Sequence, residues 1–122
     1  MNQTLILMAG FADIGFAIFH MFFWKLFGWP DRLKVSGALN SAITQTLNIM
    51  LTLVFLLYGG KLIALGWAGA QPDLYMLACG IIFGVVRAVL QPIMFGMQSL
   101  ASKGFFVLAA AAIALHVAIL PG

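Results

Sequence analysis

The stretch GIIFGVVRAVLQP, residues 80–92, is an apolar run that contains one charged and one amide side chain. Arg87 and Gln91 lie one helical turn apart, and Gly80 and Gly84 share their side of a helix drawn at about 100° per residue. A charge near the bilayer centre costs roughly 2.5 to over 10 kcal/mol unless it is paired or hydrated. The stretch therefore predicts a membrane helix with one inward face, on which Arg87 needs a partner.

The rest of the chain has the composition of a multi-pass membrane protein. Of its 122 residues, 64% are hydrophobic and 7% are charged, whereas a soluble domain is about 45–50% apolar and about 25% charged. The six Lys and Arg residues are scattered, which argues against a nucleic-acid partner. The one cysteine, Cys79, excludes an intrachain disulfide and a multi-cysteine metal site.

Four segments have the roughly 20 mainly apolar residues that a membrane helix needs. The first lacks the positively charged start of a signal peptide and is treated as a retained helix. Short connections favour an all-α, up-down-up-down four-helix bundle that forms one transmembrane domain over residues 1–122. The four predicted helices cover residues 4–27, 38–62, 73–98 and 104–120.

The charges between these helices predict how the bundle is oriented. Positive residues favour the cytoplasmic side of a membrane, and one side of the predicted bundle carries four of them while the other carries only Lys61. Both termini should then lie outside, which in a bacterium is the periplasm. The four cytoplasmic residues are Lys25, Arg32, Lys34 and Lys103.

Helical periodicity gives each predicted helix one face that is polar, small or both. Such faces are costly against lipid, so we expect all four to turn inward. By helix, the face residues are Asp13, Ala17, His20 and Trp24; Ser41, Thr44, Gln45, Asn48 and Thr52; Gly80, Gly84, Arg87, Gln91 and Gln98; and Ala109, Ala112 and His116.

The inward faces predict one buried polar cluster that could bind a ligand: Asp13, His20, Gln45, Asn48, Arg87 and Gln91. Arg87 could pair with Asp13 and crosslink two helices, or it could bind an anion, a carboxylate or a proton-linked solute. Gly80 and Gly84 should let a neighbouring helix approach closely. Pro92 cannot donate a backbone hydrogen bond, which should leave the Ala88 carbonyl free.

His20 suits a proton relay, a haem or metal ligand, or a hydrogen-bonded packing residue. A bis-histidine haem within one chain would need His20 and His116 at one depth, yet a rise of about 1.5 Å per residue separates them by well over 10 Å. No nucleophile–base pair or nucleotide-binding motif is visible, so we expect no catalytic residue and no metal site. The identity of any cofactor stays open.

The segments HMFFWKLFGWPDRL, residues 20–33, and NSAITQTLN, residues 40–48, carry a family resemblance. They resemble a set of small four-helix bacterial membrane proteins of unknown function, which place a histidine before an aromatic helix end and asparagines in the second helix. The resemblance covers about the first half of the chain. It implies a bacterial inner-membrane location and supplies no activity.

Three functional hypotheses follow. The chain could be a small transporter or channel component in which Arg87 attracts an anionic group and Asp13 or His20 handles protons. It could be a structural or assembly subunit of a larger membrane complex. It could also be an electron-transfer subunit that binds haem or quinone through His20. Besides the lipid bilayer, we expect further copies of the chain or a partner membrane subunit, because four helices enclose little volume.

Overall fold

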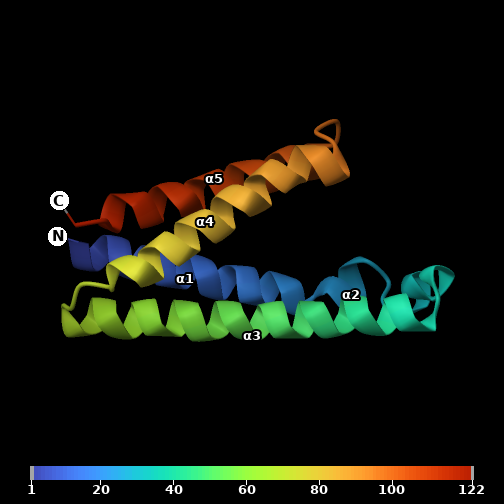
Figure 1. Cartoon of the computed structure of the whole chain (residues 1–122), viewed down its shortest axis with the longest axis horizontal. Coiled ribbons are helices and arrows are strands. Elements are labelled where there is room, and N and C mark those ends of the chain that lie inside the picture. The colour runs from blue at the N-terminus through green and yellow to red at the C-terminus, as the bar shows by residue number, and fades with distance from the viewer. Residues whose placement is uncertain (1, 122) are drawn as a thin grey trace. The chain divides into compact units, whose positions relative to one another are not determined.

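The computed structural model describes residues 2–121, and all of their regular structure is helical. Four of its helices are long and apolar enough to cross a membrane, which fits a multi-pass membrane protein and confirms the predicted all-α class. Figure 1 shows the order of the elements. They are α1 (Asn2–Met21), α2 (Phe23–Leu26), η1 (Asp31–Ser36), α3 (Ala38–Ala68), α4 (Leu74–Leu90), η2 (Gln91–Phe95) and α5 (Leu100–Ile119).

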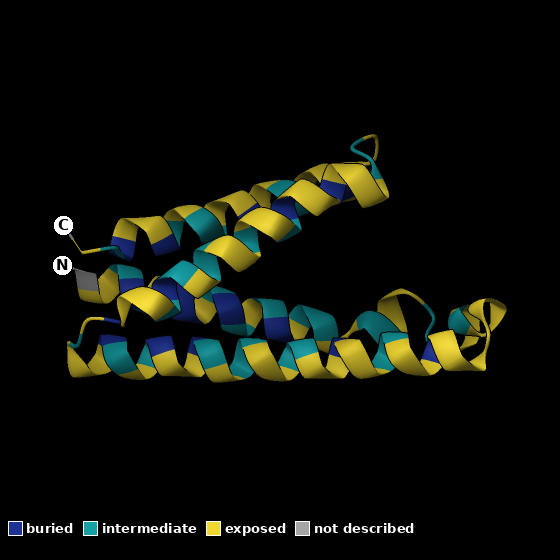
Figure 2. Cartoon of the chain, viewed as in Figure 1, coloured by how far each residue is buried: buried dark blue, intermediate teal, exposed yellow. Residues whose placement is uncertain are grey.

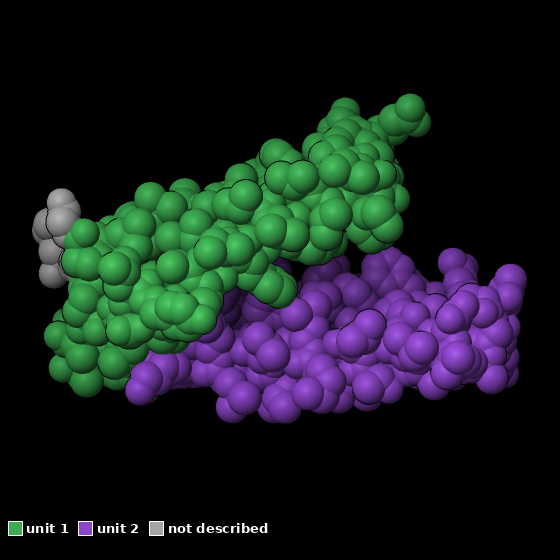
Figure 3. All heavy atoms as spheres, viewed as in Figure 1, with its two compact units in different colours: residues 1–9, 62–122 green, residues 10–61 purple. Residues whose placement is uncertain are grey.

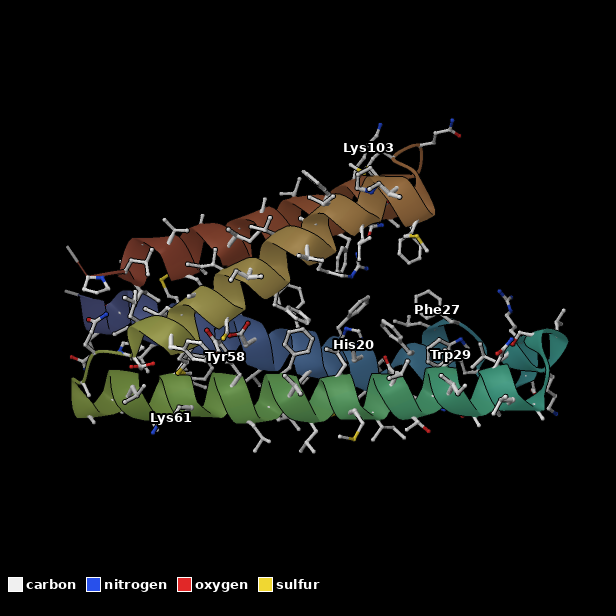
Figure 4. The ribbon with its side chains drawn as sticks, in the orientation of Figure 1. His20, Phe27, Trp29, Tyr58, Lys61 and Lys103 are labelled. Carbon is white, nitrogen blue, oxygen red and sulfur yellow. The ribbon has the colours of Figure 1, made fainter. Side chains whose placement is uncertain are left out.

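The first two long helices differ in extent from the sequence prediction. α1 ends at Met21, and the chain turns at Phe22 before the single helical turn of α2. α3 runs to Ala68 over 31 residues, about 46 Å at 1.5 Å per residue, which exceeds a hydrocarbon core of about 30 Å. Lys61 lies within α3, as the predicted range of 38–62 also had it, and Figure 4 shows its side chain pointing away from α1.

The connection between α4 and α5 begins and ends earlier than predicted. α4 stops at Leu90 and gives way to one π-helical turn, η2, which contains Pro92. The Gln91 N–H donates to the Ala88 carbonyl, so the prediction that Pro92 leaves this carbonyl free was wrong. α5 starts at Leu100 and not at residue 104, because the Ser99 side chain caps the helix by accepting from the Ser102 N–H.

The chain divides into two compact units, which Figure 3 shows in different colours. Unit 1 consists of residues 1–9 and 62–122, and unit 2 consists of residues 10–61. The apolar core of unit 1 draws on the start of α1, the end of α3, the start of α4 and the end of α5. Its members are at most 2% exposed and lie among the dark segments of Figure 2: Ile6, Ala9, Leu62, Leu77 and Ile119.

Glycines allow close helix contacts within each unit. In unit 1, a Cβ placed on Gly84 of α4 would lie 2.8 Å from Ile113 Cγ1 on α5, which agrees with the close approach predicted for this glycine. In unit 2, a Cβ on Gly59 of α3 would lie 2.9 Å from the Gly10 carbonyl oxygen on α1. The second contact meets backbone, which cannot rotate away as a side chain can, so Gly59 sets how closely α1 and α3 approach.

Gly59 and its neighbour Gly60 supply a matched test of this contact. Removing a helical glycine gains about 1 kcal/mol of helix propensity, and a Cβ on Gly60 meets nothing within 4 Å. We therefore expect Gly60→Ala to stabilise the protein by up to about 1 kcal/mol and Gly59→Ala to destabilise it by about 1–3 kcal/mol. Reversible denaturation in mixed micelles measures both, and equal effects of the two substitutions would contradict the contact.

Candidate functional site

The inward face predicted for α1 is confirmed by the burial of its side chains. Asp13 is 5% exposed and Ala17 is fully buried, while His20 is half-buried on the same side of the helix. Trp24, which the sequence placed on this face, lies beyond the end of α1, in α2, and is half-buried there. The polar row of α3 is likewise turned inward, with Ser41 and Asn48 buried and the other three members half-buried. The periodicity of the sequence is therefore a correct guide to which sides of these helices face protein.

His20 and Asn48 are joined by two hydrogen bonds across α1 and α3. The Asn48 Nδ2 group donates to the His20 backbone carbonyl over 2.9 Å, and the Asn48 Oδ1 atom lies 2.7 Å from the His20 Nδ1 atom. Turning the amide over would place its NH2 group against the ring nitrogen and its oxygen against the carbonyl oxygen. Because two oxygens cannot share a hydrogen bond without a donor, the orientation of the amide is fixed.

This arrangement decides the tautomer of neutral His20. Since Asn48 Oδ1 can only accept, the proton of the imidazole must reside on Nδ1, and the lone pair must reside on Nε2. An oriented imidazole of this kind is what a metal ligand or a proton acceptor requires. The ring packs against Phe23 at 4.4 Å between centroids and against Phe55 at 5.6 Å. Its label in Figure 4 marks its place on α1.

A second polar contact joins α2 to α3 and involves Trp24. Its indole Nε1–H donates to the Gln45 Oε1 atom over 2.9 Å. The Gln45 Nε2 group in turn donates to the Ser41 hydroxyl, over 3.1 Å, one turn earlier on α3. Gln45 is thus a specific polar partner of Trp24. These residues form the His20 group: His20, Trp24, Ser41, Gln45 and Asn48.

In unit 1, Arg87 starts a directed chain of hydrogen bonds. The Arg87 Nη1 group donates to the Gln91 Oε1 atom over 2.9 Å, and Gln91 Nε2 donates to the Ser102 hydroxyl over 2.7 Å. The Ser102 hydroxyl donates to the Gly96 carbonyl in the turn between α4 and α5. Each group donates to the next one in the direction of the turn. We call this network the Arg87 relay, and it fixes the guanidinium relative to both helices.

The partners of Arg87 within unit 1 are all neutral. Besides Gln91, its guanidinium carbon lies 4.3 Å from the ring centre of Phe105 and 5.4 Å from that of Phe95. Cation–π contacts of this kind stabilise a cation without cancelling its charge. The one acidic residue in the sequence of unit 1, Asp73, caps the far end of α4 by accepting from the Met76 N–H. Unit 1 therefore holds Arg87 in place and leaves its charge uncompensated.

The six predicted site residues therefore fall into two groups. His20, Gln45 and Asn48 lie together in unit 2, and Arg87 and Gln91 are bonded in unit 1. Asp13 is buried in unit 2, where a Cβ on Gly59 would lie 3.0 Å from its Cβ. The pairing of Asp13 with Arg87 and the union of all six residues in one cluster stay predictions.

Ser102 and the two rings beside Arg87 were missing from the sequence analysis. Phe95 and Phe105 read there as ordinary lipid-compatible residues, and Ser102 lay in a predicted loop. The sequence signal that could have found Ser102 is Ser99. A serine at the start of a helix often accepts a hydrogen bond from the backbone N–H three positions later, and that position is Ser102.

His116 is 4% exposed, and its Nδ1 atom lies 2.7 Å from the Ala112 carbonyl oxygen on the same helix. A carbonyl only accepts, so the Nδ1 atom carries the proton here too.

Within residues 2–121, no three His, Cys, Asp or Glu side chains come together as a metal site would need. Compared with known proteins, the chain matches no family model, no curated protein and no solved structure.

The two histidines give a direct test of the Asn48 contact. We expect ¹⁵N NMR of the neutral protein to show both side chains as the Nδ1–H tautomer, with His116 serving as the internal standard. Asn48→Leu should release His20 to a mixture of tautomers and leave His116 unchanged, because only His20 loses its acceptor. A wild-type His20 protonated on Nε2 alone would contradict the assignment.

Proposed function

We propose that this protein binds a small anionic solute at Arg87 and takes part in its passage across a bacterial inner membrane. The carrying observation is the neutral surrounding of Arg87, an amide and two aromatic rings, while the one acidic residue in the sequence of its unit, Asp73, caps the far end of α4. A guanidinium has five N–H donors in a fork that matches a carboxylate or phosphate. One of these donors is engaged by Gln91, and the relay holds the group in place before any ligand arrives.

The small number of acidic residues, and the contacts that two of them already make, support this function. The sequence has three acidic residues. Asp31 forms an exposed ion pair with Lys34 over 3.2 Å, and Asp73 caps α4. Asp13 is then the only counter-ion that the sequence can offer to Arg87 inside the membrane. A solute anion is the other candidate.

The proposal includes the orientation of the chain. In unit 1, the start of α1, the end of α3, the start of α4 and the end of α5 supply one core, as an up-down-up-down bundle would have at one end. With the positive residues in the cytoplasm, both termini face the periplasm and Arg87 lies nearer the cytoplasmic end of α4. Four helices enclose little volume, so a complete pathway is formed by several copies of the chain or with a partner subunit.

A structural role is the second candidate, and the Arg87 relay is the observation that favours it. Gln91 is 5% exposed and bonds both Arg87 and Ser102, so the relay already joins α4 to α5. An Arg87–Asp13 ion pair would extend this crosslink to α1. In that case the cation serves helix association within an assembly subunit, and no solute is needed.

Arg87 variants test the anion site. With purified full-length protein in detergent, acetate, benzoate, inorganic phosphate and sulfate are titrated while Tm is followed, because a ligand that binds the native state raises Tm. We expect at least one of these anions to stabilise the wild type. Arg87→Met should weaken its binding at least about tenfold, since hydrogen bonds to charged groups are worth about 1.5–3 kcal/mol. Lys103→Gln removes a charge elsewhere in unit 1 and should change little.

A double-mutant cycle separates the structural candidate. If Asp13 and Arg87 form a crosslink, Asp13→Asn and Arg87→Met each destabilise the protein and the double variant shows a coupling energy of about 0.5–3 kcal/mol. If Arg87 binds a solute, the coupling is near zero and Asp13→Asn retains anion binding. Strong coupling together with no anion effect on the wild type would overturn the anion site in favour of the crosslink.

A further inference from the structure

Arg87 also lies along a shallow groove on one side of α4 that is wide open to its surroundings, with Ile82, Phe83 and Val86 62%, 45% and 52% exposed. The groove has a volume of about 460 Å³, and the residues that line it recur every three or four positions, so they form one side of the helix. Five of the six are apolar or, as with cysteine, behave as small hydrophobes. They are Cys79, Ile82, Phe83, Val86, Arg87 and Leu90.

Arg87 is the one charged residue along the groove and lies near one end of it, with only Leu90 of the lining beyond it. Arg87 lies near the turn between α4 and α5, and the eight residues from Arg87 back to Cys79 rise by about 12 Å and add no further charge. An inorganic anion would use the guanidinium and leave the apolar part empty. A wholly apolar molecule would fill the groove and leave the cation uncompensated, which is costly inside a membrane.

We infer that the ligand of Arg87 is an amphiphilic anion with a single hydrocarbon tail and a carboxylate head, of the fatty-acid class. The carboxylate pairs with the guanidinium, and the tail lies along Val86, Phe83 and Ile82 toward Cys79. This inference rests on the proposed function, because it names the class of solute that the same site accepts. Charge complementarity at one end of an otherwise apolar groove carries it.

The direction of the groove agrees with the orientation proposed above. If the turn between α4 and α5 faces the cytoplasm, a ligand bound in this way has its head toward the cytoplasm and its tail toward the bilayer centre. That is how a single-chain amphiphile already lies in the inner leaflet. Entry to the site from that leaflet then requires a sideways movement and no reversal of the molecule.

Spin-labelled stearic acid tests the inference in vesicles of phosphatidylcholine that contain the full-length protein. Its nitroxide is carried on the hydrocarbon chain, and electron paramagnetic resonance gives the motionally restricted fraction at the protein. The neutral methyl ester of the same probe is the matched control ligand. We expect the ionised acid to associate about threefold or more in preference to the ester, a modest ratio because both probes already prefer lipid to water.

Three further measurements test whether the preference for the ionised acid over the ester arises at Arg87 and in the groove. Lowering the pH until the acid is protonated should abolish it in the wild type, a readout that needs no variant. Arg87→Met should abolish it as well, while Lys103→Gln should retain it. Val86→Trp should fill the groove and abolish binding of the labelled acid, yet leave the Tm response to acetate intact, because acetate has no tail.

The outcomes distinguish this inference from the proposed function. Equal restriction of acid and ester in the wild type, with acetate or phosphate still acting through Arg87, overturns the amphiphile and leaves the anion site. If no tested anion binds in a way that depends on Arg87, both the inference and the proposed function are overturned. A disulfide between the Cys79 residues of two copies that forms readily and resists the labelled acid also overturns the inference, because a second copy then covers the groove.

Discussion

The hydrogen bond that Gln91 donates to Ser102 holds together the two helices that carry Arg87 and its partners. It joins the end of α4 to the start of α5 over 2.7 Å, and Ser102 passes the connection on to the Gly96 carbonyl in the turn. Because the Gln91 amide then has its oxygen directed at Arg87, the same bond that closes the hairpin also aims the guanidinium. Pro92 and the π-helical turn shape the chain at this point, so the fold of the hairpin and the geometry of the candidate site have one origin.

Unit 2 uses the same chemistry with a different residue. Asn48 holds His20 by a donor and an acceptor, as Gln91 holds Arg87 and Ser102. An amide can connect two polar groups while remaining neutral, whereas a carboxylate in the same place would need a counter-charge in hydrocarbon. This explains how a chain with three acidic residues can carry so many polar side chains in its long apolar helices. The functional groups, a cation and an imidazole, are each positioned by a neutral partner.

Sequence periodicity predicts the four long helices and most of their inward faces because burial follows the 3.6-residue repeat of a helix. Gln98 is an error of this prediction, since it lies beyond the end of η2 and is exposed. The relation of Gln91 to Arg87 follows from the same repeat. The partners across helices do not, since the contacts of Asn48 with His20 and of Gln91 with Ser102 depend on how far one helix slides along another. Helix ends were missed where a single side chain decides them, as Ser99 does for α5. The Ala88 carbonyl was misjudged because backbone beside a proline can find a nearer donor, here the Gln91 N–H.

The charge of Arg87 is superfluous to the hairpin in which it lies. Gln91 and Ser102 connect α4 to α5 without any ion, and a leucine or methionine could pack against Phe105 at lower cost in a membrane. The amide and the two rings stabilise the guanidinium, yet only an anion can cancel its charge, whether Asp13 or a ligand. An ion pair with Asp13 would need no groove, yet Arg87 lies near one end of an otherwise apolar groove along its own helix. The groove is therefore the observation on which we base the proposal of a site for an anionic amphiphile, and the Arg87–Asp13 crosslink is the alternative that the double-mutant cycle tests.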